Sequence, residues 1–260
     1  MTAAAPARRA PPGNYAAASV GLGALAAVLL AAEILIQIGV VSRFIVPPPS
    51  EIIGSFGRVI VEENVFGRFL LTASECLIAG VMLTVFGVAG GVLMHRFKLL
   101  QQACETWVAA MASAPIVLMY PLFLVIFGRN AWTIIMMGFF AALPPVILKT
   151  IEGIAGTRKV LVNVGRSFNL NATQQFWKIL FPAALPTIFV GLRLGLIFAL
   201  INIVGVEFLI NFGGLGQLIN ELAERYDLAG TYAAICFVIL VSIVFFMSLE
   251  KTERWLRPVD

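Results

Sequence analysis

Charged residues are scarce in this chain: Asp, Glu, Lys and Arg make up only 12% of its 260 residues, against about a quarter in soluble domains. Hydrophobic residues make up 60%, and the mean hydropathy is +0.96, so the chain is a membrane protein. The single histidine, His95, rules out a histidine-rich metal site. The three cysteines have no metal-ligand spacing and suggest no disulfide framework.

Several catalytic and nucleotide-binding motifs are also absent. The chain has no G-x-x-x-x-G-K-[ST] loop, and it shows no catalytic triad, paired carboxylates or zinc signature. We therefore expect no enzyme activity and no cofactor in this chain. The net charge of +4 does not indicate nucleic-acid binding, because basic residues in a bilayer protein usually mark its cytoplasmic face.

Long apolar runs dominate what is present. A spanning helix needs roughly 20 apolar residues, which predicts six transmembrane helices, at 15–41, 69–94, 103–127, 131–150, 183–210 and 230–249. Pro115, Pro121, Pro144 and Pro145 are expected to interrupt the third and fourth. Ser50 is predicted to cap an amphipathic helix on the membrane surface. Residues 1–14 read as a disordered cytoplasmic leader, and 15–257 as one transmembrane domain.

The distribution of basic residues predicts the orientation. With the N-terminus inside, twelve basic residues fall on the inner side and five on the outer side. Both termini are then cytoplasmic, and so is the loop at 157–181.

That loop carries the most informative pattern in the chain. Val160, Leu161, Val164 and Phe168 have helical spacing, with polar and basic residues between them. The segment Asn169–Asn171 can turn the chain, since Asn tolerates the left-handed conformation. Asn171 with Gln174 predicts a capping box that opens a second short helix, which runs through Ile179.

The stretch 157–194 resembles the cytoplasmic EAA loop of binding-protein-dependent ABC transporter permeases. Its Glu-Ala-Ala positions fall on Asn163, Val164 and Gly165, and its later Gly falls on Asn169, so the Glu and the Gly are both replaced. The match then continues through the segment Leu180–Pro186 and the segment Gly191–Arg193. The Pro-rich stretch 113–128 and the glycine cluster 213–216, read as a re-entrant bend, are also similar to the family.

This resemblance implies an all-α membrane protein with the type I importer (MetI-like) permease fold. It implies a bacterial inner-membrane subunit that works with a cytoplasmic ABC ATPase dimer, which binds the ATP, a periplasmic binding protein and a second permease copy or paralogue. The loop residues implied to dock the ATPase are Asn163, Val164, Gly165, Ser167, Phe168, Asn169, Leu170, Asn171, Ala172 and Phe176.

The substrate is indicated only by the branch of the family. The stretches PPPSEI at 47–52 and GLRL at 191–194 look most like the nitrate, sulfonate and taurine branch, which implies a small anion. Glu75 is also similar to relatives that move pyrimidine vitamin precursors.

Four residues are candidates for the translocation path. Glu75 and Glu207 lie within spans, where a charge costs a few kcal/mol and must face protein or water, so helix packing is an equal alternative for each. Met119 and Tyr120 fall near the midplane, and Glu33 is expected to make an inter-helix hydrogen bond. A secondary transporter acting without ATP stays open, although it predicts inverted repeats and intramembrane ion ligands that are not evident.

Overall fold

The computed structural model describes residues 14–256, so all but the last residue of the predicted leader lies outside the described residues. The described chain is helical throughout and contains no strand. Its elements are α1 (Asn14–Gln37), α2 (Pro49–Glu62), α3 (Val65–Met82), the π-helical η1 (Leu83–Gly87), α4 (Val88–Arg96), α5 (Lys98–Ser113), the 3₁₀ turn η2 (Ile116–Met119), α6 (Tyr120–Phe127), α7 (Ala131–Ala155), α8 (Lys159–Ser167), α9 (Ala172–Gln175), the π-helical η3 (Phe176–Leu180), α10 (Phe181–Ile210), α11 (Gly214–Glu224) and α12 (Leu228–Leu256).

Five of the described helices are long and apolar enough to cross a membrane, and a bent pair adds a sixth crossing if it counts as one span. The bent pair replaces the span predicted at 103–127: α5 and the η2–α6 segment meet at 91°. The break falls at Ala114, whose extended backbone is what a following proline imposes, because Pro115 disfavours the helical conformation before it. The predicted interruption of the third span is therefore confirmed at Pro115.

The fourth span behaves differently. Helix α7 runs unbroken through Pro144 and Pro145, so the interruption predicted there was wrong. Each proline removes one backbone hydrogen bond, but Pro144 is buried and α7 packs along α10 in the most extensive helix pair of the fold. Packing from a neighbouring helix allows a membrane helix to tolerate such a loss.

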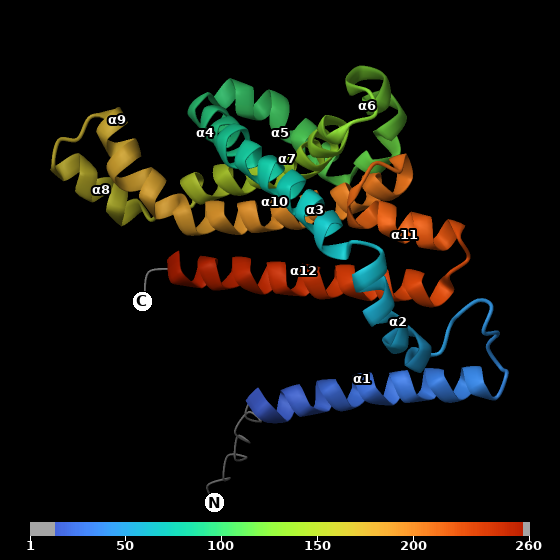
Figure 1. The fold of residues 1–260 in the computed structure, drawn as a ribbon. Coiled ribbons are helices and arrows are strands. Elements are labelled where there is room, and N and C mark those ends of the chain that lie inside the picture. Colours follow the sequence, from blue (N-terminus) through green and yellow to red (C-terminus); the bar gives the residue numbers. More distant parts are fainter. Residues whose placement is uncertain (1–13, 257–260) are drawn as a thin grey trace, which may run out of the picture.

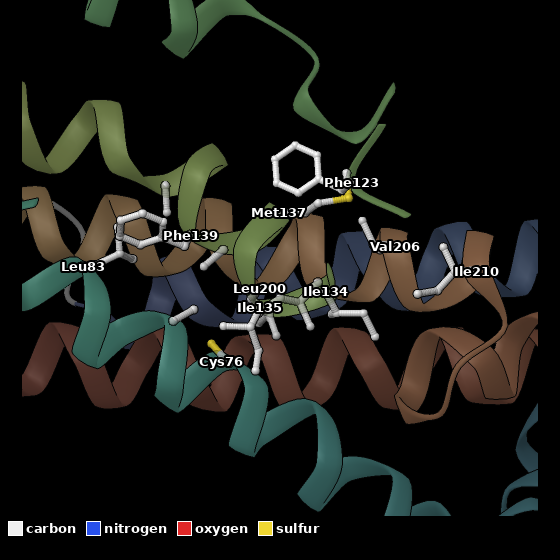
Figure 2. Packing of buried hydrophobic residues seen from close by; sticks show 14 of the residues in the cluster. Cys76, Leu83, Phe123, Ile134, Ile135, Met137, Phe139, Leu200, Val206 and Ile210 are labelled. Atoms are coloured by element: carbon white, nitrogen blue, oxygen red, sulfur yellow. The ribbon is translucent and has the colours of Figure 1, made fainter. Parts of the chain in front are cut away.

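The core lies between α7 and α10, with α3 and η1 against it (Figure 2). Ile134, Met137 and Ile203 are fully buried there. The two backbones come close at Gly195, where an added Cβ would lie 3.1 Å from the carbonyl oxygen of Ala142. Small residues permit this kind of contact in membrane bundles.

Figure 1 shows how the ends of the bundle differ. The loop with α8 and α9 lies at one end, on the side where α1 begins and α12 finishes, whereas α6 and α11 lie at the other end. We call these the loop end and the opposite end. Helix α1 lies at the edge, with only 6% of its apolar window buried.

Helix α1 meets α2 through one polar contact. The Ser50 amide and hydroxyl both donate to the Glu33 carboxylate, at 3.1 and 2.8 Å, which confirms the predicted inter-helix hydrogen bond. The same contact shows that Ser50 is not a helix cap: Pro48 occupies the N-cap position without a side-chain hydrogen bond. The Ser50 side chain bonds across to α1 instead.

Candidate functional site

The loop end presents an apolar surface on α8. The four residues predicted to share one helical face, Val160, Leu161, Val164 and Phe168, are 70%, 42%, 46% and 76% exposed. Exposure of this kind on a helix that also carries polar and basic residues marks an interaction face, because an isolated amphipathic helix gains stability by covering its apolar side.

A tight turn ends α8 at the predicted position. Asn169 has φ +52°, its amide donates to the Arg166 carbonyl, and the Leu170 amide donates to the Gly165 carbonyl. This pair of bonds is the Schellman motif, in which a left-handed residue follows the helix. Asn169 therefore fills the place of the family glycine without losing the turn.

The second helix of the loop is fixed to the first. The predicted capping box is confirmed, with the Gln174 amide donating to Asn171 Oδ1 at 2.8 Å and the Asn171 amide donating to Gln174 Oε1. The Gln175 side chain donates to the Val162 carbonyl at 3.0 Å. Gly165 faces Ile179, which a Cβ there would approach to 2.5 Å. A larger residue at this position would require the Ile179 side chain to move.

The second helix was predicted to be short. It instead continues without a break into the long apolar helix that follows. Helices α9, η3 and α10 form one apolar span from Ala172 to Ile210. Pro182 lies just after the π-helical η3, and a local π adjustment of this kind compensates for the amide donor that a proline lacks inside a membrane helix. The second helix of the loop is therefore the first part of a long helix and not a separate element.

The predicted docking residues divide by exposure. Seven are exposed at the loop surface, Leu170 and Phe176 are half-buried, and Gly165 is buried between the helices. Phe176 packs against the cluster of Ile154, Ala184 and Ile188 at the root of the loop. The exposed seven are Asn163, Val164, Ser167, Phe168, Asn169, Asn171 and Ala172.

Charge is distributed unequally between the two ends. The described structure gives no ion pair or side-chain hydrogen bond to any of the loop's four basic residues, which are Arg158, Lys159, Arg166 and Lys178. At the opposite end, basic residues are paired: Arg58 with Asp227 at 2.6 Å, Arg68 with Glu221 at 2.6 Å and Arg225 with Glu63 at 2.7 Å.

These pairs tie α2 and α3 to the corner between α11 and α12. Burial pushes the pKa of Asp227 upward. The hydrogen bonds from Arg58 and the Gly230 amide, together with the charges of Arg58 and Arg225, outweigh this and hold it below its usual value. Tyr226 at the same corner is 89% exposed and has φ +59°, in another Schellman turn.

Glu207, on α10, holds the start of α11 in place through hydrogen bonds. Its carboxylate accepts hydrogen bonds from the Thr72 hydroxyl at 2.7 Å and from the Gly216 amide at 2.8 Å, and Thr72 in turn accepts from the Leu215 amide at 3.0 Å. Glu207 is fully buried, and its carboxylate accepts a hydrogen bond from the first turn of α11, where backbone amides have no acceptor within the helix. Gly216 is required here because a Cβ would collide with the Val204 carbonyl and the Glu207 side chain.

Helix α11 itself was not predicted, although a signal for it was present. Leu215, Leu218 and Leu222 recur at i, i+3 and i+7 and are each 1% exposed. The expected bend at the glycine cluster is found, since Gly213 and Gly214 have φ +70° and +77°.

Glu75, which is on α3, lies beside Glu207 of α10. It is 2% exposed, and its carboxyl group lies next to that of Glu207. Its place in the translocation path, like that of Glu207, stays a prediction.

Met119 and Tyr120 lie just beyond the bend in the third span. Met119 is 43% exposed, while Tyr120 packs against the core. Next to them a cavity of about 410 Å³ opens at the break, between the end of α5 and α10, with the residues around Pro115 on one wall and Phe198 and Asn202 on the other. Asn202 is the one polar side chain among these walls, apart from backbone groups.

Comparison with known proteins identifies related sequences and folds. Residues 83–258 match the family model described as binding-protein-dependent transport system inner membrane component. The aliphatic sulfonates transport permease SsuC of Bacillus subtilis, named as putative, is 26% identical over 91% of this chain and 83% of its own. The taurine permease TauC of Escherichia coli is 20% identical over 92% and 89%. The nitrate permease NrtB of Synechocystis is 29% identical over 68% and 64%.

Two solved structures show the fold. A chain of the MetNI methionine ABC transporter in an inward-facing conformation superposes with a TM-score of 0.65 at 18% identity, covering 75% of this chain and 96% of that one. A chain of an amino acid ABC transporter superposes with a TM-score of 0.59 at 15% identity, covering 76% and 95%. The predicted type I importer permease fold is thereby confirmed.

Proposed function

The chain belongs to the family of binding-protein-dependent transport system inner membrane components, and from this premise we propose that its loop end is the docking site for a cytoplasmic ABC ATPase. As a member of this family, the chain is the permease subunit of an importer and not an enzyme. ATP is bound and hydrolysed by the partner ATPase dimer, and no cofactor belongs to the permease.

The observation that carries the docking role is the exposed apolar face of α8 on a rigid mount. Phe168, at the C-terminal end of this face, is 76% exposed, and the Schellman turn around it and the capping box after it fix the backbone. Asn163 supplies no charge where the family has Glu, so the apolar face and the unpaired basic residues provide the contact. Closing of two ATPase subunits on ATP would then draw two such loops together and rock the bundles outward-open.

Sidedness follows from the same assignment. The loop end faces the cytoplasm, both termini lie on that side of the bacterial inner membrane, and the opposite end meets the periplasmic binding protein. Two permease copies, or this chain with a paralogue, enclose the path, since one bundle of five or six spans is too small to do so. The cavity at the bend, with Met119 and Tyr120 beside it, and the Glu75–Glu207 region are our candidates for the path.

For the substrate we propose a small anion such as a sulfonate, taurine or nitrate, because the relatives that transport these compounds match over most of the chain. One observation favours a second candidate. The cavity at the bend has no basic side chain on its walls, which suits a neutral heterocycle. The formylaminopyrimidine permease ThiX of Halalkalibacterium halodurans, 23% identical over 83% of this chain, is a relative of that kind.

The docking role is tested with the variant Phe168→Asp, purified with the cognate ATPase and reconstituted in liposomes. Burying a Phe side chain contributes about 1.5–3 kcal/mol, so replacing it with a charge should weaken ATPase binding by at least about tenfold. Phe44→Asp is the matched control, because Phe44 is 91% exposed but lies outside the loop. Equal ATPase affinity in both variants would refute the docking role.

Two further measurements separate the alternatives. Uptake of labelled taurine and of labelled formylaminopyrimidine, each with its binding protein, distinguishes the two substrate classes. Liposomes that contain the permease without its ATPase should show no uptake. Uptake in the absence of the ATPase would instead indicate a secondary transporter and overturn the proposal.

A further inference from the structure

A second cavity lies at the loop end, beside the exposed face of α8, and it shares Ala172 and Phe176 with the predicted docking residues. It measures about 380 Å³ and opens between the end of α4 and the start of the long helix at α9. Cavities of about 300–1,000 Å³ commonly hold small ligands. Its lining combines apolar side chains with polar ones; the polar ones belong to His95, Arg96, Thr173 and Gln175.

The lining carries the positive charge of Arg96 and no negative charge, because no acidic residue lines the cavity. Arg96 is exposed and takes part in no described ion pair or side-chain hydrogen bond, and His95 Nδ1 is buried without a hydrogen-bond partner among the described residues. No carboxylate among the described residues pairs with Arg96, so the cavity can accept an anion from outside the chain.

The level of the cavity in the membrane indicates which kind of anion could reach it. Trp177 follows Phe176 in sequence, stands edge-on to its ring at 5.2 Å between centroids, and is 60% exposed. Exposed tryptophans at the ends of membrane spans sit at the level of the lipid headgroups. Trp177 also packs against Phe181, the first residue of α10. Phe176, which lines the cavity next to Trp177, therefore lies near the headgroup level, and the cavity with it.

We propose that this cavity binds the headgroup of an anionic phospholipid, with Arg96 contacting the phosphate and Thr173 able to donate to it. Basic pockets between membrane helices on the inner side recognise such headgroups. The inference rests on the proposed sidedness of the loop end. A lipid seated there bridges α4 and α9, and so holds the loop against the bundle in the conformation seen here.

Trp177 provides the measurement. In a full-length variant that keeps only this tryptophan (Trp107, Trp132 and Trp255 replaced by Phe), quenching by brominated phosphatidylglycerol is compared with quenching by brominated phosphatidylcholine in bilayers of the two lipids. We expect phosphatidylglycerol to be preferred at Trp177. Arg96→Gln should lower this preference about fivefold, the factor that one basic residue near an anionic surface contributes.

Two further variants make the test specific. Arg158→Gln is the matched control, since Arg158 is also an exposed, unpaired Arg of the loop end but does not line the cavity. It should keep the preference. Ala172→Phe fills the cavity without changing charge and should remove it. Thermal unfolding of each variant confirms that the fold is retained.

Three outcomes would overturn the proposal. Equal losses in Arg96→Gln and Arg158→Gln would indicate diffuse surface charge. Displacement of the lipid by inorganic phosphate would indicate a site for a free anion, and displacement by the added ATPase would assign the cavity to protein docking. The lipid measurement requires neither ATP nor transport, so its failure would leave the proposed function standing, and the failure of ATPase coupling would not change lipid preference.

Discussion

Replacing Thr72 with Val should loosen the opposite end of the bundle by a measurable amount. The two side chains have nearly the same shape, but Val loses the hydroxyl that donates to Glu207 at 2.7 Å and accepts from the Leu215 amide at 3.0 Å. An amide left unpaired in a buried site costs about 1–3 kcal/mol, and a hydrogen bond to a charged group contributes about 1.5–3 kcal/mol. A loss of about 3 kcal/mol would lower the Tm by about 6–12 °C.

The assay is thermal unfolding of the purified permease in detergent, followed by the fluorescence of its tryptophans. Thr84→Val is the matched control, because the Thr84 hydroxyl bonds only to the Gly80 carbonyl of its own helix, at 2.9 Å, and leaves no donor unpaired when removed. Thr72→Ser should restore most of the stability. Equal shifts in Tm for the two Val variants would refute the reasoning, since Thr72 would then contribute no more than an ordinary helical threonine.

Three more predictions concern the same two ends. Gly216→Ala should disrupt the α10–α11 turn and lower the Tm by several degrees, which the unfolding assay measures. The pKa of Asp227 is depressed in the folded protein, so its pairing with Arg58 stabilises the fold fully above the unfolded-state pKa of about 3.9. This stabilisation is lost as the pH falls through the folded-state pKa. Asp227→Asn should therefore flatten the fall in Tm below about pH 4 and leave the dependence of Tm on pH unchanged between pH 5 and 8. In a cysteine-free variant, cysteines at Ser167 and Tyr226 should react with an impermeant maleimide from opposite sides of the membrane, and labelling from one side would refute the proposed topology.

Local features were readable from the sequence because their causes are local. The left-handed turn at Asn169 and the capping box at Asn171 each depend on residues within one helical turn, so their chemistry suffices to predict them. The apolar runs likewise predicted the first, second, fourth and sixth spans to within about five residues, whereas the fifth begins at Ala172, well before the predicted residue 183. In the loop, the periodicity of Val160 and Phe168 predicted the exposed face that the structure displays.

Features set by distant contacts were not readable. Thr72 and Glu207 are 135 residues apart, and nothing near either residue indicates the other. Pro115 and Pro144 have the same chemistry, yet one marks a 91° bend and the other lies within an unbroken helix, because only the second is held against a neighbouring helix along its length. The chemistry of proline sets the free-energy cost of continuing a helix through it. Packing against a neighbouring helix decides whether that cost is compensated.

The continuity of the helix from Ala172 to Ile210 links the two ends mechanically. At about 1.5 Å per residue, these 39 residues extend close to 58 Å without a loop to absorb motion. One end is fixed to α8 through Gln175 and Gly165, and the other is fixed through Glu207 to α11. A displacement of α8 reaches α10 through η3 and Pro182, where helices can bend. Any tilt of α10 moves α7 with it, because the α7–α10 interface is the largest in the fold and close-packed interiors deform little. The bend at Pro115, where the third span is already broken, is the place where such a tilt meets least resistance.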